Sequence, residues 1–217
     1  MANDIDFRFA SVSLFVWPVT CQGYLAPVLQ RCHLVFLSMS DDVVLVPLKR
    51  FDLAKKRLRR SGAVDSTSIA RDLAIAVIAA CRPRRIVVVG ESPQLGEFAS
   101  ELGVEYFDSG ADDLNGAVQL AYRRLAWSDQ RVFVVHGDLR DPQGLGLFEP
   151  DEGVTIVTDH HGTGTTVLVV PGGLDFLFCY GPDSARRHQR EAIRLGVRLR
   201  IINDSPWAWD VDEVDDL

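Results

Sequence analysis

From residue 42 to the C-terminus, short apolar runs alternate with segments in which apolar residues recur at helical spacing. The apolar runs have the length of strands and cover residues 43–46, 86–89, 104–107, 132–135, 154–157, 166–170, 174–180 and 197–202. The segments with helical spacing cover residues 66–80, 93–102, 112–127 and 184–195. Because strands alternate with helices, the pattern predicts an α/β sandwich with a mainly parallel sheet.

Ligands of such sheets bind beyond the carboxyl ends of the strands, so the segments that follow strands are the first candidates for a site. A basic segment, residues 49–60, follows the first predicted strand, and Asp138 follows a central one. A Gly/Thr-rich turn lies between two later strands. We therefore expect these three features to meet in one crevice.

The Gly/Thr-rich turn has the sequence DHHGTGTT, residues 159–166. Small residues let backbone N–H groups approach a ligand closely, and threonine hydroxyls add hydrogen-bond donors. Further along, the GPDS sequence at 181–184 opens a predicted helix, whose N-terminus favours anions. Two such loops side by side predict a phosphorylated ligand, whereas the Gly-Thr-Gly-Thr run alone fits a structural turn equally well.

The basic segment concentrates positive charge in an acidic protein. Between Lys49 and Arg60 seven residues are basic and one is acidic, while the whole chain carries a formal charge of −7. Such a run is usually a solvated helix face, and the alternative is a loop that neutralises a polyphosphate. The position of the run directly after the first strand favours the loop.

Three carboxylates from distant parts of the chain are candidate metal ligands. Asp138 follows an apolar strand and Gly137, and Asp210 and Asp212 fall on one face if that segment is extended. Oxygen ligands of this kind suit Mg²⁺, which often shares them with phosphates. The second pair could instead belong to an acidic C-terminal tail, but the tryptophans at 207 and 209 favour an anchored segment.

Composition narrows the class of protein. With 217 residues, 47% of them hydrophobic, the chain suits one globular domain, or one domain with an appendage, and its negative charge argues against general nucleic-acid binding. The four cysteines lack C-x-x-C spacing, so they predict neither a zinc site nor a disulfide framework. No apolar run reaches the length of a membrane span. We therefore expect a cytoplasmic protein without nucleic-acid or membrane partners.

The first 38 residues have no clear strand or helix period, and Met39 follows them. The stretch also starts with a net negative charge, unlike a signal peptide. We hypothesise that Met39 is the biological start and that residues 1–38 are an N-terminal extension, either not native or poorly ordered. Residues 39–217 would then form the functional domain. Mass spectrometry of the natively expressed protein tests this, since an intact peptide from residues 1–30 would contradict it.

Several short motifs follow one another along the chain: VPLK (46–49), LAKKRL (53–58), LN (114–115), GDL (137–139), GTGT (162–165), GPDSARRH (181–188) and DVD (210–212). In this order they resemble one known family, the CofC/FbiD guanylyltransferases of coenzyme F420 biosynthesis. The resemblance extends over about residues 42–217 and implies a Rossmann-like three-layer sandwich of the GT-A nucleotidyltransferase type. It also implies transfer of GMP from GTP to a phosphorylated three-carbon acid, with release of pyrophosphate. The acceptor is phosphoenolpyruvate or 2-phospho-L-lactate in some members and 3-phosphoglycerate in a few.

The resemblance also implies roles for individual residues. The acceptor phosphate would be held by the Gly/Thr turn, through Thr165 or Thr166, and by Gly181 and Ser184. The GTP phosphates would face Lys49, Lys55 and Arg57, with Asn115 in the nucleotide pocket. The catalytic set would comprise Asp138 and those three basic residues, and Mg²⁺ would be held by Asp138, Asp210 and Asp212. A homodimer, and a hand-off of product to the next transferase of the F420 pathway, stay open.

The chain departs from the family pattern in several places, including a shortened stretch at 140–158 and Lys56 in the basic segment, and these departures bear on the acceptor more than on the reaction. Arg140 follows the GDL motif, where proline is usual, and His160 stands where arginine is common. Two other functions stay open: a different GT-A nucleotidyltransferase, whose glycine-rich opening loop is missing here, and a non-catalytic nucleotide-binding homologue. We expect His188 to be solvated, since its helix is rich in arginine and glutamate.

Overall fold

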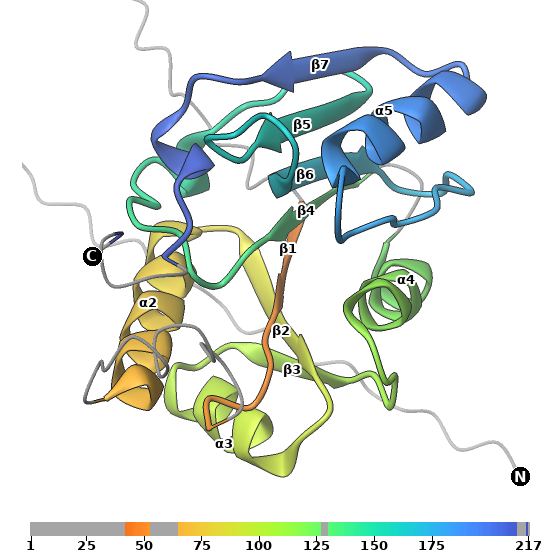
Figure 1. The fold of residues 1–217 in the computed structure, drawn as a ribbon. Coiled ribbons are helices and arrows are strands. Elements are labelled where there is room, and N and C mark those ends of the chain that lie inside the picture. Colours follow the sequence, from red (N-terminus) through yellow and green to blue (C-terminus); the bar gives the residue numbers. More distant parts are fainter. Residues whose placement is uncertain (1–41, 53–64, 127–129, 212–215, 217) are drawn as a thin grey trace, which may run out of the picture. The chain divides into compact units, whose positions relative to one another are not determined.

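A computed structural model describes residues 42–52, 65–126, 130–211 and 216 (Figure 1). The expected N-terminal extension, residues 1–38, lies outside the described residues. No helix in the described ranges is both long enough and apolar enough to cross a bilayer.

Within the described residues, seven strands form one sheet in the order β3-β2-β1-β4-β6-β5-β7 (Figure 1). Their bounds are β1 Val43–Pro47, β2 Arg85–Gly90, β3 Glu105–Asp108, β4 Arg131–Val135, β5 Val154–Thr158, β6 Thr165–Pro171 and β7 Leu199–Ile202. The first four are mutually parallel, and β7 is parallel to β5. Strand β6 runs antiparallel to both of its neighbours, β4 and β5. This confirms the predicted mainly parallel, mixed sheet.

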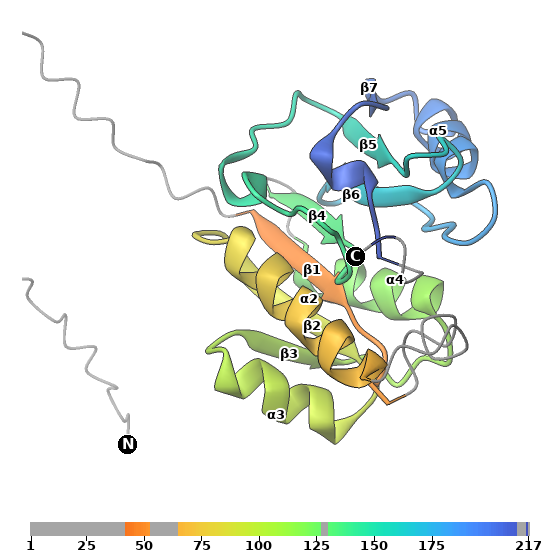
Figure 2. The same cartoon turned by 60° about the vertical axis from the view of Figure 1, so that its left-hand side comes forward.

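Helices cover both faces of the sheet, which makes the predicted three-layer sandwich (Figure 2). The helices are α2 Ser66–Ala80, α3 Pro93–Glu101, α4 Leu114–Leu125 and α5 Ser184–Arg194, with 3₁₀ turns η1 Leu145–Leu147 and η2 Pro206–Ala208. Helices α2 and α3 pack in one apolar cluster and α4 and α5 in another. Neighbouring strand residues alternate between these clusters: Val43 and Leu45 face α4, whereas Val44 faces α2. A strand covered on both faces must be apolar at every position, which is why these strands read as continuous apolar runs.

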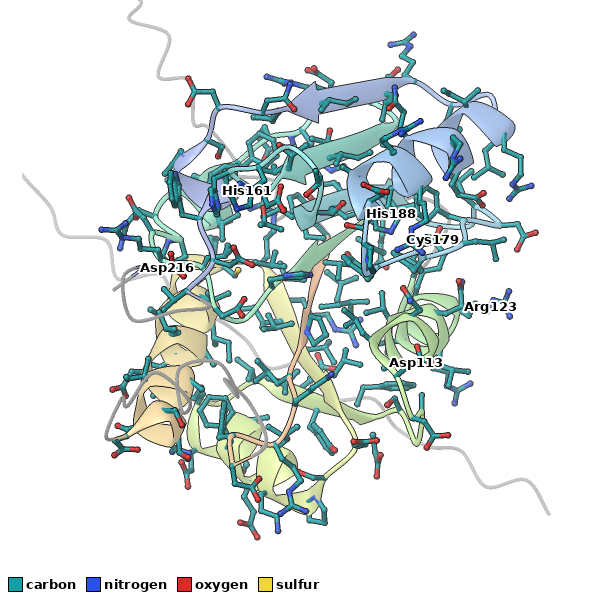
Figure 3. The ribbon with its side chains drawn as sticks, viewed as in Figure 1. Asp113, Arg123, His161, Cys179, His188 and Asp216 are labelled. Atoms are coloured by element: carbon teal, nitrogen blue, oxygen red, sulfur yellow. The ribbon has the colours of Figure 1, made fainter. Side chains whose placement is uncertain are left out.

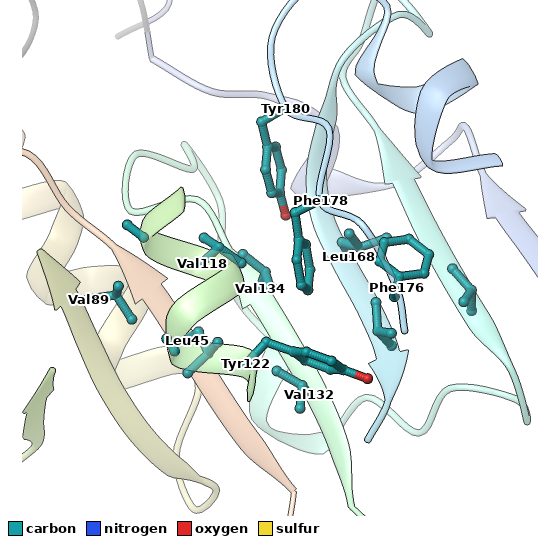
Figure 4. Packing of buried hydrophobic residues seen from close by; sticks show 14 of the residues in the cluster. Leu45, Val89, Val118, Tyr122, Val132, Val134, Leu168, Phe176, Phe178 and Tyr180 are labelled. Carbon is teal, nitrogen blue, oxygen red and sulfur yellow. The ribbon is translucent and has the colours of Figure 1, made fainter. Parts of the chain in front are cut away.

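The predicted strand over 174–180 is wrong, because this segment has no regular secondary structure. Its backbone N–H groups donate to side chains of α4 and α5 instead of a neighbouring strand. Phe178 donates to Gln119, Leu177 to Glu191, Cys179 to His188 and Tyr180 to Asn115. Its aromatic side chains enter the core beside Tyr122 of α4 (Figure 4). The apolar run is therefore a core segment held by two helices.

A buried ion network ties the strands together at the opposite end of the sheet from the predicted crevice. The Asp42 carboxylate, just before β1, accepts hydrogen bonds from the guanidinium of Arg131 at 2.6 and 3.1 Å. It also lies 3.7 Å from the Arg84 guanidinium, whose side chain is 3% exposed. Arg84 in turn donates to the carbonyl of Leu145 at 2.7 Å, which fixes the turn η1. Buried charges are tolerated only when paired in this way.

Candidate functional site

A cavity of about 360 Å³ lies at the carboxyl ends of the parallel strands, where the sequence predicts a crevice. Its walls come from segments just beyond β1, β2, β3 and β4 and from the start of α4. Lys49 and Asp138 both line it. A second hollow shares Lys49, Asp112 and Asp113 with the first and extends to Tyr180 and Gly181. The structure therefore brings a cation from the basic segment, the carboxylate after β4 and the Gly181 loop to one edge of the sheet.

Gly137 allows β4 to end against the β1 segment. A Cβ atom at this position would lie 2.3 Å from Cδ2 of Leu48, whose neighbour is Lys49. A larger residue would force the end of the Leu48 side chain to move. Glycine at 137 therefore lets Leu48 pack directly against the end of β4.

The C-terminal segment pairs with the loop that carries Asp138. An isolated antiparallel bridge joins Leu139 to Asp210, and the N–H of Val211 donates to the carbonyl of Asp138 at 3.0 Å. Leu139 and Val211 are buried, so their apolar contacts anchor the bridge. Two of the three predicted metal ligands, Asp138 and Asp210, are therefore backbone neighbours although they are far apart in sequence. In the described parts of the chain, no cluster of three or more His, Cys, Asp or Glu side chains is arranged to hold a metal ion.

Aromatic packing explains why this segment is not a loose tail. Trp207 packs edge-on against Phe148 with ring centroids 5.0 Å apart, and its indole N–H donates to the carbonyl of Gln143 at 2.8 Å. Trp209 stacks on His160 at a centroid distance of 4.2 Å and an interplanar angle of 6°. The departure His160 therefore links the Gly/Thr turn to the strand-like piece that carries Asp210.

The Gly/Thr turn closes on one of its own carboxylates. Asp159 accepts hydrogen bonds from the N–H of Thr163 at 2.8 Å and from the Thr163 hydroxyl at 3.3 Å. A Cβ at Gly164 would lie 2.5 Å from that carboxylate, so a larger residue there would displace the Asp159 side chain. The carbonyl of Thr163 also accepts from the N–H of Ala185 at 3.0 Å, so the tip of the turn is fixed both by its own carboxylate and by the start of α5.

Thr165 and Thr166 point to opposite faces, as successive residues of β6 must. The Thr166 hydroxyl donates to the carbonyl of Val157 on β5 at 3.3 Å. The Thr165 hydroxyl instead meets the Ser184 hydroxyl at 3.2 Å and Nδ1 of His188 at 3.1 Å. Of the two threonines, the structure joins Thr165 to Ser184 at the start of α5. Gly181, with φ of 109°, makes the turn before this helix in a conformation that favours glycine.

The amide of Asn115 is engaged with the main chain. Its Oδ1 accepts from the N–H of Tyr180 at 2.5 Å, and its Nδ2 donates to the Tyr180 carbonyl at 3.2 Å. Asn115 lines the second hollow, but its polar atoms hold the core segment 174–180 in place. Lys55, Arg57 and Asp212 lie outside the described residues.

The expectation that His188 is solvated is wrong. Its side chain is fully buried on α5 and lies beside Cys179 (Figure 3). Burial, with smaller contributions from the charges of Arg187 and His136, lowers the pKa of His188 to about 3. The inward face of α5 also contains Ser184, Glu191 and Ala192, which are spaced three to four residues from His188 or from one another. That spacing, counted from Ser184, is the sequence signal that would have placed His188 inside.

Because the folded state keeps His188 neutral while the unfolded chain has an ordinary histidine pKa, acid should destabilise the fold through this residue. The unfolded state takes up the proton below about pH 6.5, whereas the folded state does so only near pH 3. The free energy of unfolding should therefore fall by about 2 kcal/mol between pH 7 and pH 5 from His188 alone. Urea unfolding at both pH values checks this against H188N, in which the fall should be smaller by that amount. An equal fall in both proteins would contradict it.

The chain is similar to a recognised family over nearly all of its described part. Residues 42–217 match the family model described as "Guanylyl transferase CofC like". A phosphoenolpyruvate guanylyltransferase from Chloroflexus aurantiacus is 32% identical over 185 residues, which cover 78% of this chain and 89% of that protein. A protein of the same name from a Mycobacterium species is 32% identical over 188 residues, covering 80% and 83%.

Solved structures share the fold at lower sequence identity. A nucleotide-diphospho-sugar transferase from Desulfovibrio desulfuricans superposes with a TM-score of 0.64 at 16% identity, covering 82% of this chain and 85% of that one. A nucleotidyl transferase from Methanothermobacter superposes with a TM-score of 0.53 at 17% identity, covering 82% and 94%. These likenesses confirm the nucleotidyltransferase type of sandwich.

Proposed function

The chain belongs to the CofC-like guanylyl transferase family, and from this premise we propose that it transfers GMP from GTP to phosphoenolpyruvate or a closely related phosphorylated three-carbon acid. As a member of that family it is a nucleotidyltransferase, with a nucleotide and a phosphorylated acceptor as substrates. The names of its relatives favour phosphoenolpyruvate, and coenzyme F420 biosynthesis is the pathway that the family implies. One juxtaposition supports the proposal most strongly: Lys49 and Asp138 line one cavity, and the backbone of Asp210 pairs with the Asp138 loop.

The reaction needs no general base. An oxygen of the acceptor phosphate, already ionised near neutral pH, attacks the α-phosphorus of GTP, and the bond to the bridging oxygen breaks to release pyrophosphate. The main obstacle is repulsion between two anions, so catalysis depends on holding them in line and neutralising their charge. Lys49 is suited to neutralise the triphosphate, and we propose that Lys55 and Arg57 assist it.

The residues present fit a divalent cation, which a nucleotidyltransferase family suggests, and we propose that it is Mg²⁺. Asp138 and Asp210 offer the carboxylate oxygens that Mg²⁺ prefers, and Asp212 would complete the set. When bound, the ion would shield charge on the triphosphate and help to orient the α-phosphate. The bridge between Leu139 and Asp210 keeps the two carboxylate-bearing segments side by side, which supports the proposal.

For the acceptor phosphate we propose Thr165, Gly181 and Ser184. The two hydroxyls contact each other, and Ser184 opens α5, where backbone dipoles favour an anion. Thr166 supports this group through the sheet, because its hydroxyl is bonded to β5 and its carbonyl accepts from the N–H of His136 at 3.0 Å.

An assay of pyrophosphate release tests the proposed function. The full chain with Mg²⁺ would be incubated with each of GTP, ATP, CTP and UTP against phosphoenolpyruvate, 2-phospho-L-lactate, 3-phosphoglycerate and a panel of sugar phosphates. Release with GTP and one three-carbon acid is the expected result, with the product trapped by the next pathway enzyme if it is labile. Release with sugar phosphates would indicate a different nucleotidyltransferase. GTP binding without any release would indicate a non-catalytic homologue.

Ser184→Ala should raise the KM for the acceptor about tenfold and leave the KM for GTP within about twofold, because it removes one hydrogen bond to a charged group. Steady-state kinetics with each substrate varied in turn gives both constants. Ser68→Ala on the exposed part of α2 is the matched control and should change neither. A rise in the KM for GTP alone would mean that the Ser184 loop belongs to the nucleotide.

A further inference from the structure

His188 contacts Thr165, one of the two hydroxyl residues proposed for the acceptor phosphate. Thr165, Ser184 and His188 are all buried and line neither hollow, whereas Gly181 in the turn before Ser184 lines the second one. Its ring packs edge-on against Tyr180 with centroids 4.8 Å apart and lies 6.0 Å from the ring of Phe176. Both ring nitrogens have partners on different elements. Nε2 contacts the N–H of Cys179 at 2.9 Å, and Nδ1 contacts the Thr165 hydroxyl at 3.1 Å.

The Cys179 contact determines where the imidazole proton lies. A backbone N–H can only donate, so Nε2 must accept with its lone pair. A neutral imidazole has one N–H, which must then be at Nδ1. The pKa of about 3 keeps the ring neutral near physiological pH. Nδ1–H therefore donates to the hydroxyl oxygen of Thr165.

This tautomer leaves one hydroxyl proton of the Thr165–Ser184 pair unused. Each hydroxyl has one proton, and the bond between the two oxygens uses one of them. With Nδ1–H donating, the remaining proton points elsewhere, and within the described residues neither hydroxyl contacts a further acceptor. If Nδ1 instead accepted from Thr165, and Thr165 from Ser184, both protons would be used. The tautomer thus decides whether the pair can donate to an anion.

We propose that His188 is a positioning residue that holds the Thr165–Ser184 pair as a hydrogen-bond donor toward an anionic group, the phosphate of the acceptor. The identity of the anion rests on the proposed function. The tautomer of His188 and the unused hydroxyl proton rest on the hydrogen-bond geometry. Thr165 and Ser184 are each 2% exposed, so bulk water competes poorly for the spare proton. A donor bond to a charged oxygen in such surroundings is stronger than one in water.

Two substitutions of similar size separate positioning from packing. H188N keeps an N–H donor near the position of Nδ1, whereas H188L removes it. We expect H188L to raise the KM for phosphoenolpyruvate about tenfold with the KM for GTP within about twofold, and H188N to raise it about threefold or less. Equal rises in both variants would indicate packing and would overturn the proposal.

A double-mutant cycle asks whether His188 acts through Thr165. T165V removes the hydroxyl that His188 contacts, so H188L should change the acceptor KM little further in a T165V background. Full additivity of the two effects would contradict the proposed route.

A third measurement needs no variant of His188 and no turnover. NMR spectra would be recorded of the wild-type protein with ¹⁵N-labelled histidine, and spectra of H160Q and H161Q would assign the signals of the exposed rings. The His188 signals in the wild-type protein should show a protonated Nδ1 and an unprotonated Nε2. Addition of inorganic phosphate or phosphoenolpyruvate should shift the Nδ1 signal. A protonated Nε2, or no shift at saturating phosphoenolpyruvate, would overturn the inference. Since this experiment reports binding alone, failure of GMP transfer in the pyrophosphate assay would be a separate result.

Discussion

Asp138→Asn is expected to lower turnover on the order of a thousandfold while leaving the fold intact. The substitution keeps the size of the side chain but removes the charge that, together with Asp210, is proposed to hold the divalent ion. Without that ion, the repulsion between acceptor and triphosphate is neutralised by basic side chains alone, and losses of this size follow when a main electrostatic contact in a transition state is removed. Initial rates of pyrophosphate release at saturating GTP and acceptor give the effect.

The fold is expected to survive because asparagine keeps the backbone contact that joins this loop to the C-terminal segment. The carbonyl of Asp138 accepts from Val211, and asparagine keeps that carbonyl. Circular dichroism and thermal unfolding should therefore match wild type. Asp141→Asn in the same loop is the matched control: Asp141 is exposed, its carboxylate accepts from the N–H of Gln143, and its amide variant should retain activity. Normal turnover in D138N would remove Asp138 from the proposed metal site.

Asp42→Asn should destabilise the fold by about 3 kcal/mol, the largest stability effect we expect from a change of similar size. The substitution leaves the Arg84 guanidinium, which is almost completely buried, without its nearest buried counter-charge. It also weakens the paired hydrogen bonds from Arg131. The remaining acidic partner of both arginines, Glu149, is largely exposed and compensates little. Urea unfolding of the two proteins at pH 7 measures the difference.

Glu105→Gln offers a matched carboxylate-to-amide control on the surface. Glu105 also accepts two hydrogen bonds from an arginine, Arg85, at 2.7 Å each, but both side chains are substantially exposed. Water replaces most of what is lost there, so the free energy of unfolding should change by no more than about 1 kcal/mol. If D42N and E105Q had the same small effect, the burial of the Asp42 network would contribute nothing to stability.

The predicted crevice is the part of the site that sequence reasoning could reach. A parallel sheet places the carboxyl ends of its strands at one edge, so the segments after the strands must converge whatever their distance in sequence. The cavity lined by both Lys49 and Asp138 confirms this for the start of the basic segment and for Asp138. The Gly/Thr turn, residues 159–166, lines neither this cavity nor the second hollow. The anchored C-terminal segment is confirmed as well, because Trp207 is packed against Phe148 and bonded to the Gln143 carbonyl.

The hydrogen-bond partners of polar side chains could not be predicted from the sequence. The hydrogen bonds between Asn115 and Tyr180 join residues 65 positions apart. No local sequence pattern distinguishes an asparagine that holds a distant segment in place from one that lines a ligand pocket. Thr165 and Thr166 are likewise indistinguishable in the sequence, although their side chains lie on opposite faces of β6. The burial of His188 was missed because the charge of its helix outweighed the spacing of its inward face.

The sequence by itself determined the helices, most of the strands and the edge of the sheet at which the candidate site residues lie. Periodicity and strand length are local properties of consecutive residues, so they can be recognised without the tertiary structure. Tertiary structure alone decided that residues 174–180 are a core segment and not a strand, because an apolar run reads the same in either setting and only its hydrogen-bond partners differ. It also decided which hydroxyls meet and which tautomer His188 adopts. Those depend on contacts between β6, α5 and the segment before α5, whose relative placement follows from packing of the whole domain.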